Sequence, residues 1–202
     1  MLTLTERKDL CSLLVQLFSY PDADLSARLA EPKTALLAAR MAIPPLTGPE
    51  SDWTTLEPAY TSLFINRLGG VPAPPYGSVY LDDDGQVMGP STLRVAQCYQ
   101  QAGLVIDSPE PPDFLATELE FLFYLVDLEG AGKKEESACV QRLFFHELFL
   151  PWITPFCQRL TASDPHLLYS WAATLLQAFC YQEAEHLRTL PFYPAAPELD
   201  PL

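Results

Sequence analysis

The chain has 202 residues, of which 49% are hydrophobic and 19% charged, a composition typical of one soluble globular domain. Its 26 acidic and 12 basic residues give a net charge of -14, which disfavours binding to nucleic acid or anionic lipid and favours cationic peptides. The N-terminus lacks the pattern of a secretory signal, and no run of about 18 apolar residues predicts a membrane helix, so we expect a cytoplasmic protein without membrane insertion.

The N-terminal segment predicts an amphipathic helix. Thr3 and Glu6 match a capping box, and apolar residues follow at positions 10, 13, 14, 17 and 18, the spacing of one helix face. This helix is expected to end near Tyr20-Pro21. Two shorter helices are expected at residues 24–30 and 32–42, before the helix-breaking prolines and glycine of residues 44–49.

A further helix is expected to begin near Thr54, where Glu57 would complete a second capping box. Its apolar face would carry Tyr60, Leu63 and Phe64.

Residues 69–89, GGVPAPPYGSVYLDDDGQVMG, predict a long loop rich in Pro, Gly and Asp. Loops of this length are usually functional or disordered, and the apolar and aromatic residues Val71, Tyr76 and Tyr80 argue against simple disorder. Within the loop, Asp82-Asp83-Asp84 is typical of a solvated turn closed by Gly85.

Two helices are predicted after this loop. Ser91 can cap the first, which would run to about Gln101 and stop at Gly103. The prolines of residues 109–112 then favour an extended entry into the second helix, with Asp113 as its cap. Because that second helix is apolar on most sides, we expect it to run through the core as far as Gly130 and Gly132.

The remaining helices are expected at residues 133–146, at 152–160, and from Asp164-Pro165 through Leu187. The Pro-rich residues 189–202 predict an irregular tail. Since no segment alternates with period two for long enough to form a sheet, the sequence predicts an all-α, single-domain helical bundle over residues 1–188.

Nothing in the sequence indicates catalysis, a metal site or a bound cofactor. Ser78 lacks the flanking glycines of a nucleophile elbow, and no phosphate-binding loop is present. His146 and Glu147 could form an acid/base pair, but a hydrogen-bonded histidine at a helix end is the much more common arrangement. The 5 cysteines show no C-x-x-C spacing and are expected to be reduced thiols.

Carboxylates gather around the start of the predicted core helix, at Glu110, Asp113, Glu118 and Glu120. Capping explains Asp113, and the helix dipole favours Glu110 and Glu118. Neither effect explains why a proline-stiffened segment should project Glu110 just before the helix.

Five short motifs occur in a fixed order along the chain. They are Tyr60-x-x-Leu63-Phe64, Pro72-Ala-Pro-Pro-Tyr-Gly-Ser-Val-Tyr80, Gly89-x-Ser-Thr92, Glu110-Pro-Pro-Asp113 with Glu118, and His146-x-Leu148 with Pro151-Trp152. In this order and helical context, from about residue 4 to residue 188, the chain resembles the TorD/DmsD/NarJ family of redox-enzyme maturation chaperones. The likeness is greatest to the chaperones of dimethyl sulfoxide and trimethylamine N-oxide reductases. One position departs from the family pattern, because Phe114 stands where the pattern Glu-Pro-x-Asp-His has histidine.

The resemblance implies a cytoplasmic, all-helical chaperone, either monomer or homodimer. It would bind the twin-arginine leader and the folded part of a molybdopterin oxidoreductase subunit, delay its export and assist cofactor insertion. Two other classes stay open on the residues alone: a helical assembly subunit that does not recognise a leader, and a small hydrolase that uses Glu and His.

A twin-arginine leader requires a site that combines carboxylates with aromatic and aliphatic surface, because a guanidinium binds carboxylates through two hydrogen bonds and stacks on aromatic rings. We expect the loop at residues 69–89 to fold over the start of the core helix as one wall of a groove, with residues 109–112 as the other wall. The predicted peptide-binding residues are Tyr60, Leu63, Phe64, Tyr76, Tyr80, Glu110, Pro111, Asp113, Phe114 and Glu118.

Overall fold

The computed structural model describes residues 1–46, 55–105, 107–132 and 134–190, and within these ranges the chain forms helices and no strand. The α-helices are α1 (Leu4–Phe18), α2 (Leu25–Leu29), α3 (Pro32–Arg40), α4 (Leu56–Tyr60), α5 (Ser78–Leu81), α6 (Pro90–Gln101), α7 (Leu115–Gly130), α8 (Lys134–Leu143), α9 (Leu150–Ala162) and α10 (Leu167–Thr189). Two π-helical segments, Thr61–Ile65 and Phe144–Phe149, extend α4 and join α8 to α9. The predicted all-α, single-domain fold is confirmed.

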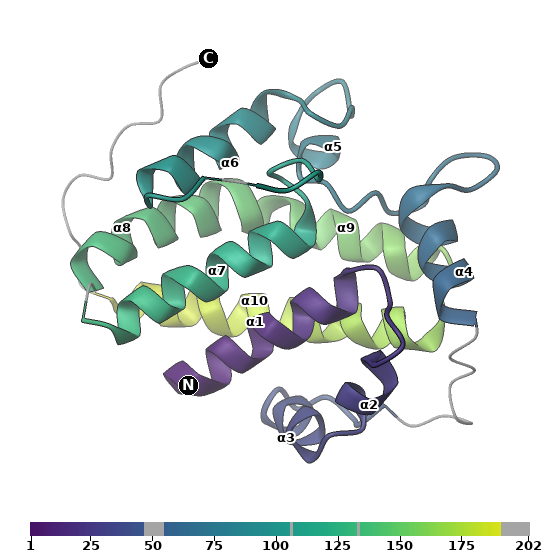
Figure 1. Ribbon diagram of the computed structural model, residues 1–202, viewed down its shortest axis with the longest axis horizontal. Helices are drawn as coiled ribbons and strands as arrows, with labels where there is room; N and C mark the ends of the chain where they lie inside the picture. The colour runs from purple at the N-terminus through teal and green to yellow at the C-terminus, as the bar shows by residue number, and fades with distance from the viewer. Residues whose placement is uncertain (47–54, 106, 133, 191–202) are drawn as a thin grey trace.

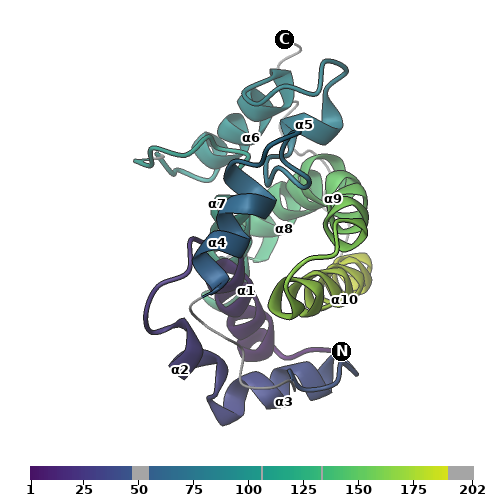
Figure 2. The ribbon, with the colours of Figure 1, turned by 90° about the vertical axis from the view of Figure 1, so that its right-hand side faces the viewer.

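The core is built around α7, which packs along α1, while α1 and α9 both pack against α10 (Figure 1). Leu115, Leu119, Leu122 and Leu125 of α7 are fully buried, as expected for a helix that is apolar on most sides. The α5–α6 region lies at one end of this core and the α2–α3 region at the other, as the two views together show (Figure 2). The described part of the chain has no helix long and apolar enough to span a membrane.

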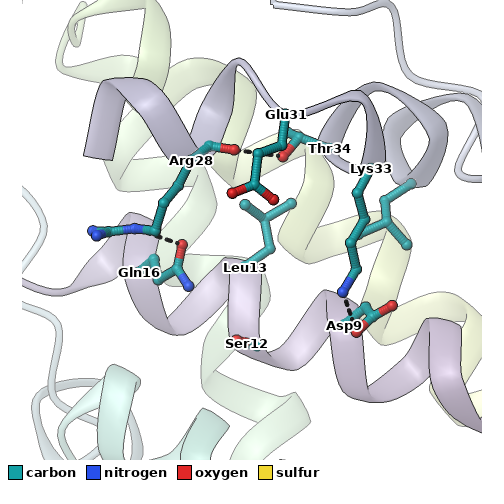
Figure 3. Close-up of a pocket in the computed structure, with 9 residues that line it drawn as sticks. Asp9, Ser12, Leu13, Gln16, Arg28, Glu31, Lys33 and Thr34 are labelled. Carbon is teal, nitrogen blue, oxygen red and sulfur yellow. Dashed lines mark hydrogen bonds and ion pairs between the residues drawn. The ribbon is translucent and has the colours of Figure 1, made fainter. Parts of the chain in front are cut away.

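The N-terminal prediction is confirmed in detail. The Thr3 hydroxyl accepts a hydrogen bond from the Glu6 N–H at 3.2 Å, and the Glu6 carboxylate accepts one from the Thr3 N–H at 2.7 Å. The α2–α3 pair is joined to the outer face of α1 by polar contacts around a small pocket, where Lys33 binds Asp9 at 2.6 Å and Arg28 binds Gln16 at 3.1 Å (Figure 3). These contacts fix the position of the α2–α3 pair on the bundle.

The predicted cap of α6 was wrong. Ser91 lies inside the first turn of α6 and does not cap it; the carboxylate of Asp82 accepts the Ser91 N–H at 3.1 Å and the Ser91 hydroxyl at 2.8 Å. A Cβ on Gly89 would lie 2.2 Å from Asp82 Oδ2, so glycine is needed for this approach. At the other end of α6, Gly103 has φ +77° and stops the helix as predicted.

The C-terminal half differs from the prediction at two points. The gap expected between residues 146 and 152 is helical, because a π-helical segment there places Phe144, Phe145, Leu148 and Phe149 in the core. The last helix begins at Leu167 and not at Asp164-Pro165: Asp164 has φ +53°, outside the helical range, and His166 Nδ1 accepts the Leu168 N–H at 3.2 Å. The capping box expected at Thr54 and the tail from residue 191 lie outside the described residues.

Candidate functional site

The loop at residues 69–89 folds over the start of α7, through one antiparallel bridge between Tyr76 and Phe114. The Gly77 N–H donates to the Asp113 carbonyl and the Leu115 N–H donates to the Pro75 carbonyl, both at 2.9 Å. The rings of Tyr76 and Phe114 lie 5.6 Å apart on this bridge. The loop also contains the single helical turn of α5, so it is a folded part of the molecule.

Asp113 does not cap α7, contrary to the prediction. Its side chain is fully buried, and its Oδ2 accepts a hydrogen bond from the Ser78 N–H at 2.7 Å, at the start of α5. The first amide of α7, at Leu115, is satisfied by the loop carbonyl of Pro75. Asp113 therefore holds the loop, and the loop in turn supplies the missing acceptor for α7.

Glu118 is also fully buried, and a direct contact with a bound peptide stays a prediction for it. Its Oε2 accepts a hydrogen bond from Trp152 Nε1–H of α9 at 3.0 Å. Burial, together with the charge of nearby Asp113, raises the pKa of the Glu118 carboxyl well above its ordinary value of 4.5 and favours the neutral acid. Gly77 packs against the same Trp152, since a Cβ there would lie 3.1 Å from Nε1.

The other edge of the loop is held by α9. The Tyr80 ring stacks on Trp152 with centroids 5.6 Å apart, and the Arg159 guanidinium lies 5.2 Å from the Tyr80 ring. Arg159 Nε–H also donates to the Pro72 carbonyl at 3.0 Å. Tyr80 is thus already in contact with an arginine of its own chain, and its contact with a leader stays a prediction. No local pattern in the sequence pairs Arg159 with Pro72, so Arg159 was missed.

Tyr60, Leu63 and Phe64 lie behind the loop in the core, each at most 4% exposed. The Tyr60 hydroxyl donates to the Phe18 carbonyl at 2.9 Å, and the Leu63 carbonyl accepts the loop amide of Ala73 at 3.2 Å. These residues support the loop from inside, and a direct contact with peptide stays a prediction for them.

Four of the predicted residues reach solvent together: Tyr76, Glu110, Pro111 and Phe114, which we call the bridge surface. Glu110 is exposed, and its Oε2 accepts a hydrogen bond from the Tyr76 hydroxyl at 3.0 Å. Burial, and then this bond, raise the pKa of Tyr76, so the phenol remains a neutral donor. The bridge surface presents a carboxylate beside two aromatic rings, which is a suitable environment for a guanidinium.

Within the described residues, no group of three or more His, Cys, Asp or Glu side chains is placed to hold a metal ion. All five cysteines are free thiols. Burial raises the pKa of Cys98 and of Cys157 to about 12, so neither is a reactive thiolate at neutral pH.

Comparisons with known proteins agree on one family. Residues 22–158 match the family described as the nitrate reductase delta subunit. The chaperone protein TorD of Vibrio vulnificus is 33% identical over 119 residues, 56% of this chain and 55% of the relative. The Tat proofreading chaperone DmsD of Salmonella paratyphi A is 32% identical over 117 residues, 57% of this chain and 53% of the relative. The matched regions thus span little more than half the length of these curated relatives.

A solved structure from Archaeoglobus fulgidus, assigned as a redox enzyme maturation protein, superimposes with a TM-score of 0.55 at 28% identity. It covers 87% of this chain and 92% of its own. The named relatives are chaperones and not catalysts, in agreement with a binding protein and not an enzyme.

Proposed function

Because the chain belongs to the family of the nitrate reductase delta subunit and the TorD-type redox enzyme maturation chaperones, we propose that it is a cytoplasmic chaperone that binds the twin-arginine leader of a molybdoenzyme catalytic subunit. In this role it delays export of that subunit until the molybdopterin cofactor is inserted. The chaperone contacts the leader and a folded part of the same subunit, and it acts without a cofactor of its own.

The observation that carries the proposal is the bridge surface. The Tyr76–Phe114 bridge fixes an exposed carboxylate, Glu110, next to aromatic rings and a proline on a protein with a net charge of -14. Because the loop is already folded and fixed at both edges, a peptide loses little binding energy to ordering it. A guanidinium can bind the Glu110 carboxylate while its flat face lies on Tyr76 or Phe114.

Calorimetric titration of a leader peptide against its twin-lysine variant tests this proposal. The lysine variant is expected to bind about tenfold more weakly, since lysine lacks the planar, two-point contact. Glu110→Gln should weaken leader binding about threefold to fivefold, because the lost contact is exposed. Glu31→Gln, which removes an exposed carboxylate from the α2–α3 region at the opposite end of the core (Figures 1 and 2), is the matched control.

The alternative function is a helical assembly subunit that holds its partner by apolar contacts. Equal affinity for the arginine and lysine peptides, with no weakening in 1 M salt where the screening length is about 3 Å, would favour that alternative and reject leader recognition.

A further inference from the structure

A second pocket lies beside the bridge surface, between the C-terminal end of α6 and the outer face of α7. Its volume is about 240 Å³, enough for one long side chain. The lining includes Tyr99, Leu104, Asp107, Thr117, Glu120 and Phe121. The segment of residues 107–112 connects the two places, because Asp107 lines the pocket and Glu110 belongs to the bridge surface.

The floor of the pocket is aromatic and rigid. Tyr99 and Phe121 are at most 3% exposed, and their rings meet edge to face with centroids 4.4 Å apart. The Tyr99 hydroxyl donates to the Pro112 carbonyl at 2.8 Å, which ties this floor to the segment that carries Glu110. The pocket therefore does not need to form when a ligand arrives.

The rim of the pocket is acidic. Asp107 and Glu120 are both exposed, and among the described residues neither carboxylate has a hydrogen-bond partner. None of the residues that line the pocket is basic. Partial burial of the Glu120 carboxyl raises its pKa, so this carboxylate is one that a cation would stabilise.

An arginine side chain matches both parts of the pocket. Its three methylenes suit the apolar wall at Leu104 and Phe121, and its guanidinium is planar, stacks on aromatic rings and binds carboxylates at two points. A lysine ammonium is a strongly hydrated point charge that gains less from such a floor.

We propose that this pocket receives an arginine side chain of a bound peptide, with the guanidinium held by Asp107 and Glu120. The proposal rests on the proposed leader recognition and extends it. Successive side chains of an extended peptide point to opposite sides, so two adjacent arginines can occupy the bridge surface and the pocket together, one on each. This arrangement gives a physical reason for a requirement for two arginines and not one.

The test uses argininamide as a probe, with lysinamide as its control, and follows the amide resonances of the whole chain by NMR. Argininamide is expected to shift the resonances of Leu104, Thr117 and Phe121, and lysinamide to shift them less at equal concentration. Thr117→Phe, which fills the pocket without changing charge, and Glu120→Gln, which keeps its shape, should each abolish or reduce these shifts. The proposal is overturned if argininamide does not shift the pocket resonances of the unmodified chain. It is also overturned if argininamide shifts these resonances as much in both variants as in the unmodified chain.

Leader affinity separates this inference from the proposed function. The double variant Asp107→Asn with Glu120→Gln should bind the leader about threefold to tenfold more weakly than the control Asp24→Asn with Glu31→Gln, which makes the same change of charge at the α2–α3 end of the core. If both double variants bind the leader equally, the pocket assignment fails while leader recognition stands. If argininamide binds the pocket but the unmodified chain binds no leader, the proposed function fails and the pocket remains a site for arginine in another peptide.

Discussion

Glu118 and Glu110 come from the same acidic cluster in the sequence but lie in opposite environments. Glu110 is exposed and accepts a hydrogen bond from a phenol, whereas Glu118 is fully buried against Trp152, and its Oε1 has no hydrogen-bond partner among the described residues. Sequence patterns alone could not tell the two environments apart, since Glu110 lies just before α7 and Glu118 lies in its first turn. The separation comes from α9, which packs Trp152 over Glu118 and leaves Glu110 in solvent.

The raised pKa of Glu118 makes stability depend on pH in a definite direction. The folded state keeps the proton more tightly than the unfolded chain, whose ordinary value is 4.5. The stability from this group is therefore fully present below about pH 4.5 and is lost as the pH rises toward the raised folded pKa.

Glu118→Gln should remove that loss, because glutamine is neutral at every pH and its amide oxygen can still accept from Trp152. Urea unfolding between pH 5 and about pH 8 is expected to give a flatter stability profile for Glu118→Gln than for the unmodified chain. Glu118→Leu serves as the control, because leucine leaves the Trp152 Nε1–H without its acceptor. This variant should be less stable than the unmodified chain at all pH values. Parallel profiles for Glu118→Gln and the unmodified chain would contradict a neutral, buried Glu118.

At the scale of the elements, the helices and their apolar faces could be predicted from the sequence. A helix cap could be predicted only where the capping side chain is close in sequence to the amide that it binds. Thr3 and Glu6 cap α1 within one turn, so the pattern was visible in four consecutive residues. Asp82 caps α6 from a preceding turn, and Asp113 binds the α5 amide of Ser78 across 35 positions of sequence. Such partners are set by tertiary packing, which propensity and spacing do not encode.

The same limit applies to the candidate site. The sequence predicted that the loop would lie over the start of α7, and the bridge between Tyr76 and Phe114 agrees. It did not predict that Asp113 and Glu118 would be buried, nor that Arg159 would hold Pro72. Their partners lie on other elements, and a carboxylate beside a helix start is ordinarily solvated.

Gly89→Ala should destabilise the start of α6, although its φ of -80° suits any residue, because the new Cβ would collide with the Asp82 carboxylate. We expect a loss of about 1 to 3 kcal/mol, the usual range for overpacking. Asp82→Ala alone should cost about 1 kcal/mol as a lost cap. In the Asp82→Ala background the Gly89→Ala change should cost much less, and a thermal-unfolding double-mutant cycle measures this coupling. Additive losses would show that the two residues do not meet.

At the scale of the whole molecule, one buried ion cluster joins four helices. Arg7 of α1 binds Glu183 of α10 through two hydrogen bonds of 2.6 and 2.8 Å, and Glu129 of α7 at 2.6 Å. Gln141 of α8 donates to the same Glu183 at 2.8 Å. Burial favours neutral Glu129, but hydrogen bonds from His186 and Arg7 outweigh it and hold the pKa of Glu129 at about 2. Its stabilising contribution is present above its ordinary value of 4.5 and is lost as the pH falls toward 2.

Arg7→Met should cost about 3 to 5 kcal/mol, since it leaves two buried carboxylates without their cation. Lys8→Met, which removes a neighbouring but solvent-exposed pair with Asp127, should cost less than about 1 kcal/mol. Urea unfolding at neutral pH compares them. Equal losses would mean that the buried cluster contributes no more than a surface pair.

The loop at residues 69–89 is attached both to the start of α7 and to α9, and these attachments determine how its backbone amides exchange with solvent. The amides of Gly77 and Ser78 donate to the carbonyl and the buried carboxylate of Asp113, and the same turn is covered by Trp152. In native-state hydrogen exchange these two amides should therefore exchange as slowly as amides in α7 and α9, through a shared opening of the core. The amides at residues 83–88, whose side chains are exposed, should exchange orders of magnitude faster through local fluctuation. Slow exchange of the Gly77 and Ser78 amides, at the centre of this surface loop, would show that this part of the chain is already ordered before a peptide binds.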